Sequence, residues 1–263
     1  MSKRTLTFLG TGASCGVPSY YCGCKACEEA LANPIAQRTC AGLLIKGDEN
    51  TLIDAGPDLR MQLVNAEVKD LARAIFTHEH FDHIGGIPQL EYYVKLKTQQ
   101  PLPIYAGIET LETIEQQFGF MNDSLEIHRM LVWEQLTFDQ VSYTALPATH
   151  SNGAFGYLIE HNKHRIAYFP DTGPLQKTVI EKIQNLDILI IDATFNGNNW
   201  MPRSHHSIND AITLAQILQP KQTYLTHLSM HYDTPITVVE LEKLLAEQEA
   251  DIQVAFDGLT IAL

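Results

Sequence analysis

Apolar and polar positions alternate along this chain in patterns that predict short strands first and a succession of strands and helices later. Strands are indicated by short runs of apolar, β-branched and aromatic residues bounded by turn-forming residues. These runs are residues 4–10, two strands within 41–56 around a polar turn at 47–50, 72–78, 142–150, 155–161, 164–171, 187–194, 222–227, and two strands within 252–263. Residues 187–194 are almost entirely apolar, so we expect this strand to be buried on both faces.

Helical spacing of apolar residues appears between these strands. It covers residues 87–98, 109–120, 174–186, 207–219 and 235–248, and Ser207 or Asn209 is a suitable N-terminal cap for the fourth helix. The short polar motifs stand where strands end. This arrangement predicts an α/β layered architecture with its site at the strand ends, in a single domain that spans residues 1–263 without a linker or repeat.

Composition and charge narrow the classes of partner. No apolar run approaches the roughly 18 residues that a membrane span needs, so no membrane contact is expected. The formal net charge is −13, whereas a protein that binds nucleic acid usually presents a basic face. An anionic substrate remains compatible with this charge if bound metal cations dominate the local field.

The five cysteines are Cys15, Cys22, Cys24, Cys27 and Cys40. Their number is odd and three of them fall within six residues, which is unlike the paired, dispersed cysteines of a secreted disulfide framework. We therefore predict a cytoplasmic protein with reduced thiols, three of them placed to bind a metal. Buried free thiols are the alternative.

The run from Thr77 to His83 is the strongest chemical signal. It places three histidines and the carboxylates of Glu79 and Asp82 directly after an apolar strand. Imidazole nitrogen and carboxylate oxygen are the ligands that Zn²⁺, Mn²⁺ and iron prefer. His78 and His80 are two residues apart, so an extended backbone would direct both to one side.

Further ligand types follow other predicted strands. His150, Asp171 and His227 each stand at the end of a strand, where a lone residue of this kind is more often a cap or a turn residue. Together with residues 78–83 their spacing is specific, and it predicts a metal centre.

This combination resembles the metallo-β-lactamase superfamily, and the resemblance covers nearly the whole chain. It implies a four-layer αβ/βα sandwich with two divalent ions, Mn or Zn, in the cleft between the sheets. By position, one ion is held by His78, His80 and His150, the other by Asp82, His83 and His227, while Asp171 bridges them. Asp54 is then expected to orient ligands from behind.

The N-terminal motifs narrow the resemblance. Residues 9–12, 16–18 and 22–27 resemble the opening of the phosphoribosyl cyclic phosphate phosphodiesterases of the carbon–phosphorus lyase pathway. The resemblance implies a structural zinc on Cys22, Cys24, Cys27 and a late histidine. In that family the histidine lies three residues after the last active-site histidine, where this chain has Met230. His231 is our predicted fourth ligand, with Cys40 as the fallback.

Residues 203–207 carry a second feature of the superfamily's phosphodiesterases, in which a histidine at this position donates a proton to the leaving group. That residue is His205 by position, His206 is the alternative, and a surface pair without a role is the remaining interpretation. We count Asp82 with His205 among the catalytic residues. The resemblance implies a metal-bridging hydroxide that attacks phosphorus while the histidine acts as general acid.

The predicted function is a dinuclear metal-dependent phosphodiesterase acting on a small cyclic phosphodiester such as phosphoribosyl 1,2-cyclic phosphate. One rival is a tRNA 3′-processing endonuclease, which usually carries an RNA-gripping arm where residues 151–170 form one predicted hairpin. A lactone, thioester or β-lactam hydrolase would not need His205. A non-enzymatic scaffold should have lost ligands. Relatives of this type are often dimers, so a homodimer is a further expectation.

Overall fold

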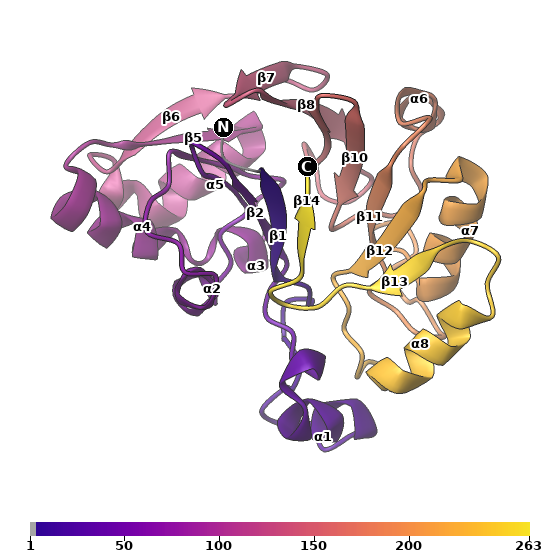
Figure 1. Cartoon of the computed structure of the whole chain (residues 1–263). Helices are drawn as coiled ribbons and strands as arrows, with labels where there is room; N and C mark the ends of the chain where they lie inside the picture. Colours follow the sequence, from indigo (N-terminus) through magenta and orange to yellow (C-terminus); the bar gives the residue numbers. More distant parts are fainter. Residues whose placement is uncertain (1–3) are drawn as a thin grey trace.

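Two seven-stranded sheets face each other in the computed structural model, which describes residues 4–263 (Figure 1). The first has the order β14-β1-β2-β3-β4-β5-β6 and the second β13-β12-β11-β10-β9-β8-β7. The first-sheet strands are β1 (Thr5–Gly10), β2 (Gly42–Lys46), β3 (Thr51–Ile53), β4 (Arg73–Ile75), β5 (Leu102–Ala106), β6 (Leu125–Arg129) and β14 (Thr260–Ala262). The second-sheet strands are β7 (Gln135–Phe138), β8 (Val141–Pro147), β9 (Phe155–His161), β10 (His164–Phe169), β11 (Ile188–Asp192), β12 (Gln222–Thr226) and β13 (Ile252–Val254).

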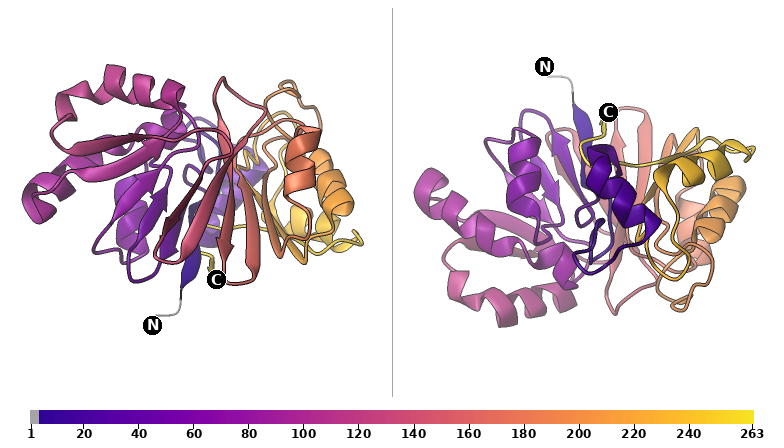
Figure 2. Two further views of the ribbon diagram at one scale, coloured as in Figure 1. Left: turned by 90° about the horizontal axis from the view of Figure 1, so that it is seen from above. Right: turned by 90° about the horizontal axis from the view of Figure 1, so that it is seen from below.

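Helices cover the outer faces of both sheets, and α1 lies below the sheets in the view of Figure 1 (Figures 1 and 2). The helices are α1 (Lys25–Ala32), α2 (Leu59–Asn65), α3 (Phe81–Ile84), α4 (Ile87–Tyr93), α5 (Ile108–Phe118), α6 (Lys177–Lys182), α7 (Ile208–Leu218) and α8 (Val238–Ala246). A π-helical turn, Val94–Thr98, extends α4. Within the described residues no helix is both long and apolar enough to cross a membrane.

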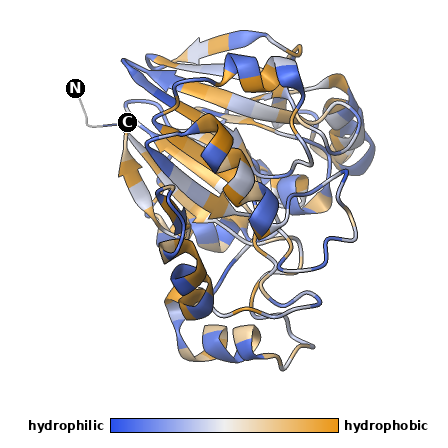
Figure 3. Ribbon diagram, turned by 90° about the vertical axis from the view of Figure 1, so that its right-hand side faces the viewer, coloured by the Kyte–Doolittle hydropathy of each residue, from blue (hydrophilic) through white to orange (hydrophobic). Residues whose placement is uncertain are grey.

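The buried apolar residues form three clusters, one for each interface between layers. One cluster lies between the second sheet and helices α6, α7 and α8. Another lies between the first sheet and helices α2, α4 and α5, and the remaining cluster fills the space between the two sheets. The helices carry both hydrophobic and hydrophilic residues, as amphipathic helices do (Figure 3). This layering confirms the predicted four-layer αβ/βα architecture.

The directions of the strands determine where the loops that carry the predicted site residues lie. Each sheet combines antiparallel and parallel pairs, and the parallel sets are β3-β4-β5-β6 and β10-β11-β12-β13. The carboxyl ends of parallel strands meet at one edge of a sheet. The loops that leave β4, β10, β11 and β12 therefore lie at common edges of their sheets, where the motifs of the sequence analysis stand.

Several elements differ from the predicted ones. No strand was predicted for β5, β6 or β7, and no helix for α1 or α2, whereas α6 is shorter than the predicted helix at 174–186. The cap at the start of α7 is Ser207, whose hydroxyl accepts a hydrogen bond from the Asp210 amide at 3.1 Å. The first three residues of the predicted single domain lie outside the described part of the chain.

Candidate metal centre

Three histidines from two loops form a tripod. His78 and His80 follow β4, and His150 follows β8. The three ring centroids lie 4.7 Å from one another in every pair. His150 donates its Nδ1 hydrogen to the Ser204 carbonyl at 2.8 Å, which leaves Nε2 with a free lone pair, 2.9 Å from Nδ1 of His80. The tripod therefore presents nitrogens at a spacing suited to one metal ion.

A second cluster lies beside the tripod and is fully buried. Ligand atoms of Asp82, His83, Asp171 and His227 all lie within 4.8 Å of one another. The short helix α3 presents Asp82 and His83 from adjacent positions, and the ends of β10 and β12 present the other two. Oδ2 of Asp171 lies 2.7 Å from Nε2 of His83 and 3.4 Å from Nε2 of His78. Asp171 thus stands between the two groups of predicted ligands.

The donor atoms of these clusters fit divalent cations. Among the described residues, the buried Nε2 atoms of His78 and His83 make no hydrogen bond, although a carboxylate oxygen lies close to each. Unpaired nitrogens aimed at a buried carboxylate would be costly without a cation between them. The structure brings the predicted ligands together, and their nitrogen and oxygen donors are of the kind that suits Zn²⁺, Mn²⁺ or iron.

Asp54 supports the centre from behind. Its carboxylate accepts hydrogen bonds from the amide and hydroxyl of Thr77, both at 2.8 Å, and lies 2.9 Å from Nδ1 of His83. The residue has a left-handed φ of 64°, a sparsely populated conformation that aspartate tolerates better than most residues. This contact fixes the His83 ring so that Nε2 faces Asp171, as predicted for an orienting residue.

Burial and charge set the protonation of the cluster. Burial lowers the pKa of His78 well below its ordinary value, which favours the neutral imidazole that binds metal. Burial also disfavours the carboxylate of Asp82, but the neighbouring His83 and His227 outweigh it and lower the pKa of Asp82 to about 2. The Asp82 carboxylate is therefore ionised at neutral pH.

His205 lies against this cluster, and its ligand atom is within 4.8 Å of those of Asp171, Asp192 and His227. Its Nδ1 is 2.9 Å from Oδ2 of Asp192 and 3.1 Å from Oδ1 of Asp171. Burial disfavours the imidazolium, yet these two carboxylates outweigh it and raise the pKa of His205 to about 10. In the described part of the chain, every hydrogen bond of the ring runs through Nδ1. The two carboxylates therefore favour the protonated ring, and Nε2 makes no hydrogen bond among the described residues.

The sequence analysis missed Asp192 and Thr194 as site residues. Asp192 ends β11, and its second oxygen accepts hydrogen bonds from the Thr194 amide at 2.8 Å and hydroxyl at 2.6 Å. The Thr194 hydroxyl in turn lies 2.8 Å from Nδ1 of His227. The position of Asp192 could have indicated its role, because it stands at the carboxyl end of β11 just as the predicted ligand His227 stands at the carboxyl end of β12.

His206, the alternative to His205, has different surroundings. Its ring bonds the backbone of Thr172, and its Nδ1 is buried without a hydrogen-bond partner among the described residues. Burial lowers the pKa of His206, and it belongs to none of the groups of close ligand atoms in that part of the chain. Of the two histidines, His205 is therefore the one that lies beside the predicted metal ligands.

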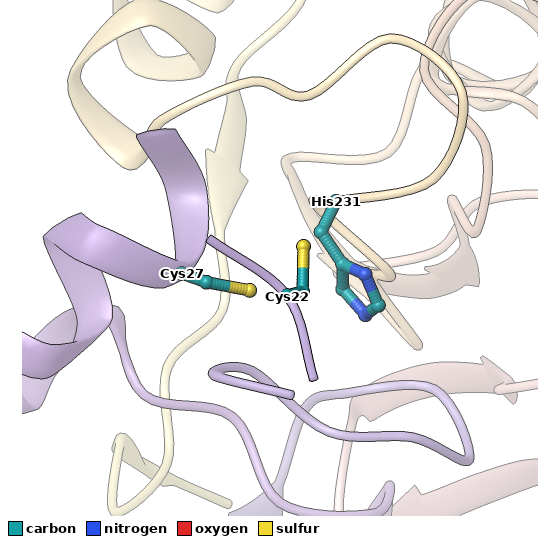
Figure 4. A group of neighbouring side chains, drawn as sticks. All are labelled: Cys22, Cys27 and His231. Atoms are coloured by element: carbon teal, nitrogen blue, oxygen red, sulfur yellow. The ribbon is translucent and has the colours of Figure 1, made fainter. Parts of the chain in front are cut away.

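A third group combines two cysteines with a histidine outside the cleft. Ligand atoms of Cys22, Cys27 and His231 lie within 4.8 Å of one another (Figure 4). Cys24 lies beside them, and a hydrogen bond from its backbone together with its thiol lowers the pKa of Cys22. Cys24 is nevertheless outside the group of mutually close ligand atoms.

His231 reaches the cysteines because the chain turns at Met230. Met230 has a left-handed φ of 55° and a buried side chain, and the His231 amide donates to the Ser229 carbonyl at 2.6 Å. This tight turn directs the His231 ring towards Cys22 (Figure 4). The shift of one position relative to the family pattern is thereby accommodated in the backbone.

The other two cysteines have separate surroundings. The Cys40 thiol donates to the Ser14 carbonyl, and Cys40 is not in the group with His231. Cys15, which the sequence analysis did not consider as a ligand, has its sulfur 3.3 Å from Nε2 of His231 and 3.0 Å from the Tyr232 hydroxyl. Cys15 is therefore nearer to His231 than the predicted fallback is.

Comparisons with known proteins agree with this geometry. Residues 49–228 match the family described as Beta-lactamase superfamily domain. The chain is 28% identical over 260 residues to an octanoyltransferase of Porphyromonas gingivalis, covering 95% of this chain but only 50% of that protein. It is 28% identical over 306 residues to ribonuclease Z of Picosynechococcus, covering 93% of this chain and 91% of that protein.

A solved structure is similar over almost the entire length. It is described as a new diphosphatase from the PhnP family and superposes with a TM-score of 0.86 at 27% identity. The match covers 99% of this chain and 98% of that one. The chain thus shares its full extent with a hydrolase structure, whereas it spans half the length of the octanoyltransferase.

Proposed function

The chain belongs to the metallo-β-lactamase superfamily, whose fold binds divalent metals such as Zn²⁺, and from that premise we propose that it is a dinuclear metal-dependent phosphodiesterase. The tripod of His78, His80 and His150 would hold one ion. Asp82, His83 and His227 would hold the other, and Asp171 would bridge them. When bound, the ions would lower the pKa of a shared water and stabilise negative charge on the phosphoryl oxygens.

The placement of His205 carries the proposal for phosphorus chemistry. Attack at phosphorus expels an alkoxide, which needs a proton at neutral pH, and a positioned imidazolium is suited to donate it. Asp192 and Asp171 hold the Nδ1 hydrogen, so the Nε2 hydrogen is the one available to the leaving oxygen. A thioester hydrolase would not need this acid, because a thiolate leaves without protonation.

The remaining side chains hold the reacting groups in place. Asp54 fixes the His83 ring, Thr194 fixes the His227 ring, and the Ser204 carbonyl fixes the His150 ring. Orienting contacts of this kind are worth roughly 10–100-fold in metal affinity or activity. All three contacts involve the Nδ1 atoms, so each Nε2 faces the space that we assign to the metal ions.

The substrate that we propose is a small phosphodiester, namely a five-membered cyclic phosphate on a ribose. Support comes from the names of two similar proteins, a diphosphatase and a ribonuclease, because both act at phosphorus. The endonuclease alternative is opposed by residues 151–170, where β9 and β10 pair directly from His161 and His164 without an intervening arm. The net charge of −13 also opposes binding to a long nucleic acid.

We further propose a structural zinc on Cys22, Cys24, Cys27 and His231, since thiolates and imidazole suit a closed tetrahedral site. All five cysteines are free, which supports a reducing, cytoplasmic location. The homodimer and the single domain over residues 1–263 remain predictions. Sedimentation of the purified protein would test the first.

A hydrolysis panel tests the main proposal. The full chain, loaded with Mn²⁺ or Zn²⁺, is assayed on a cyclic phosphodiester, a linear phosphodiester, a pre-tRNA, a lactone, a thioester and a β-lactam. We expect turnover of the cyclic phosphodiester to exceed the others in kcat/KM. A higher kcat/KM on the thioester or lactone would overturn the assignment, and full turnover of a pre-tRNA would favour the endonuclease.

A further inference from the structure

The proposed ligands of each metal ion come from both sheets. The loop after β4 of the first sheet carries residues 78–83, whereas His150, Asp171 and His227 follow β8, β10 and β12 of the second. One ion therefore depends on the contact of this loop with His150, and the other on its contact with Asp171 and His227. Because each donor atom has to lie about 2 Å from its ion, the two sheets need a fixed relative position at this place.

Strand β9 of the second sheet contacts the first sheet at the residues that open this loop. The Phe155 amide donates to the Thr77 carbonyl at 2.8 Å. Tyr157, two residues further along β9, donates its hydroxyl to the Phe76 carbonyl at 2.6 Å. Since Phe76 and Thr77 follow β4, both hydrogen bonds cross from one sheet to the other. The bond of Tyr157 ends two residues before His78, the first proposed ligand of the loop.

The surroundings of Tyr157 hold its hydroxyl in one place. The side chain is completely buried in the apolar cluster between the sheets, and its ring packs edge to face on Phe155 with the centroids 6.4 Å apart. Burial raises the pKa of Tyr157 well above its ordinary value, so the hydroxyl keeps its hydrogen at neutral pH. The Phe76 carbonyl thus meets a donor that is both fixed and protonated.

Tyr168 provides a comparison within the same cluster. It stands directly opposite Tyr157 in the register of β9 and β10, and it is buried to the same degree. Its hydroxyl, however, has no hydrogen-bond partner among the described residues. The two tyrosines therefore share their surroundings and differ in what the hydroxyl contacts.

We propose that Tyr157 is a positioning residue of the metal centre, whose hydroxyl holds the loop after β4 where ligands from both sheets reach the same ions. This inference rests on the proposed dinuclear function. Tyr157 is not itself a ligand, and it acts on His78 through the backbone of Phe76 and Thr77. Loss of the hydroxyl would take a donor from a buried carbonyl and free the start of the loop to shift relative to the second sheet.

Removal of this one hydroxyl tests the proposal on the full chain. Tyr157→Phe keeps the ring and its packing. The active-site ions are removed by dialysis against a chelator, elemental analysis checks that all variants hold the same amount of zinc, and Mn²⁺ is titrated back in a calorimeter. We expect Tyr157→Phe to weaken Mn²⁺ binding by roughly 10-fold, the lower end of the effect of residues that orient metal ligands, because the hydroxyl acts through intervening backbone.

Tyr168→Phe is the matched control. It removes a hydroxyl from the same cluster, at the position opposite Tyr157, but it costs no hydrogen bond within the described part of the chain. The affinity for Mn²⁺ should therefore stay within about twofold of that of the wild type. A loss as large as that of Tyr157→Phe would mean that any change in the cluster weakens the metal centre, and it would overturn the specific role of the Tyr157 bond.

Electron paramagnetic resonance separates positioning from a general loss of stability. Two Mn²⁺ ions roughly 3.5–4 Å apart are magnetically coupled and give a spectrum unlike that of isolated ions. At saturating Mn²⁺, the wild type and Tyr168→Phe should show the coupled pair, and Tyr157→Phe should show a larger share of isolated ions. A purely structural role would lower the melting temperature of Tyr157→Phe and leave its Mn²⁺ affinity and its spectrum unchanged.

Failure of this inference differs from failure of the proposed function. If the wild type binds no coupled pair of ions, the proposed dinuclear function is itself wrong. If the wild type binds the pair and Tyr157→Phe equals it in affinity and spectrum, the dinuclear centre stands and Tyr157 is not a positioning residue.

Discussion

Nδ1 of His205 lies 2.9 Å from Oδ2 of Asp192, and the carboxylate of Asp192 is completely buried. The pairing fixes which ring nitrogen is held by the protein and which one is left without a partner among the described residues. It also couples two elements, because Asp192 ends β11 and His205 lies just before α7. The proposed role of His205 as proton donor therefore predicts specific kinetic effects of mutation.

Replacement of His205 by alanine should separate proton donation from phosphate binding. We expect His205→Ala to keep the fold and both active-site metals, and to lose roughly 10²–10⁴-fold in activity on a diester with a poor alkoxide leaving group. On an activated aryl diester the loss should be much smaller, since a stabilised phenolate leaves without a proton. Equal losses on both substrates would mean that His205 binds phosphate instead.

Replacement of Asp192 by asparagine should change the pH dependence. The acid must be protonated, so activity is retained below the pKa of His205 and lost as the pH rises through it. Because Asp171 is a proposed metal ligand, Asp192 is the carboxylate that remains to keep this pKa high. Asp192→Asn should therefore move the basic limb of kcat/KM against pH to lower pH by at least about one unit. An unchanged limb would assign it to another group.

The site residues that could be predicted from the sequence are those of a metal-ligand type that also stand at the end of a clearly patterned strand. His78 and Asp171 follow strands whose apolar pattern is clear, so strand ends and ligand types could be combined. Asp192 was missed because it completes an apolar strand and its partner, His205, lies in a loop whose path only the fold defines. The orienting role of Asp54 was predicted from the family resemblance, but the left-handed backbone on which its contact with His83 depends is not indicated by the apolar pattern.

The missed elements have physical reasons of their own. Strand β5 contains Pro103 and follows Pro101, and proline is depleted in strands because it lacks the amide hydrogen. Strands β6 and β7 are mostly exposed or half-buried and form the edges of their sheets, so they lack the apolar runs used for prediction. Helix α1 was not predicted because the cysteine motif at residues 22–27, interpreted as a metal site, overlaps its first turn.

Removal of the bridging carboxylate should abolish the dinuclear centre. Asp171→Ala is expected to lower the metal content from two active-site ions and to reduce activity by more than the roughly 10–100-fold caused by loss of an orienting residue. Elemental analysis and kinetics on the same preparation measure both effects. Asp187→Ala is the control, because Asp187 pairs with Lys221 near the start of β11. Full metal content and activity in Asp171→Ala would contradict the bridging role.

Replacement of a single cysteine should report on the structural zinc. Cys27→Ser is expected to remove one equivalent of zinc and to lower the melting temperature, because a closed thiolate site contributes folding free energy directly. The active-site metals should remain. Cys40→Ser, which alters a buried thiol outside the group, should leave the zinc content unchanged. Cys24→Ser then decides whether Cys24 or Cys15 completes the set.

The last strand returns to the beginning of the chain. Strand β14 pairs with β1, and the Thr7 and Thr260 hydroxyls meet at 2.9 Å across a separation of 253 residues. During synthesis the edge of β1 therefore stays unpaired until residues 260–262 have left the ribosome, and contacts between residues so far apart in sequence form slowly. An unpaired strand edge exposes backbone N–H and C=O groups that can pair with a strand of another chain. A chain that stops before Asp257 should consequently keep every proposed metal ligand and still aggregate, which light scattering during refolding would detect.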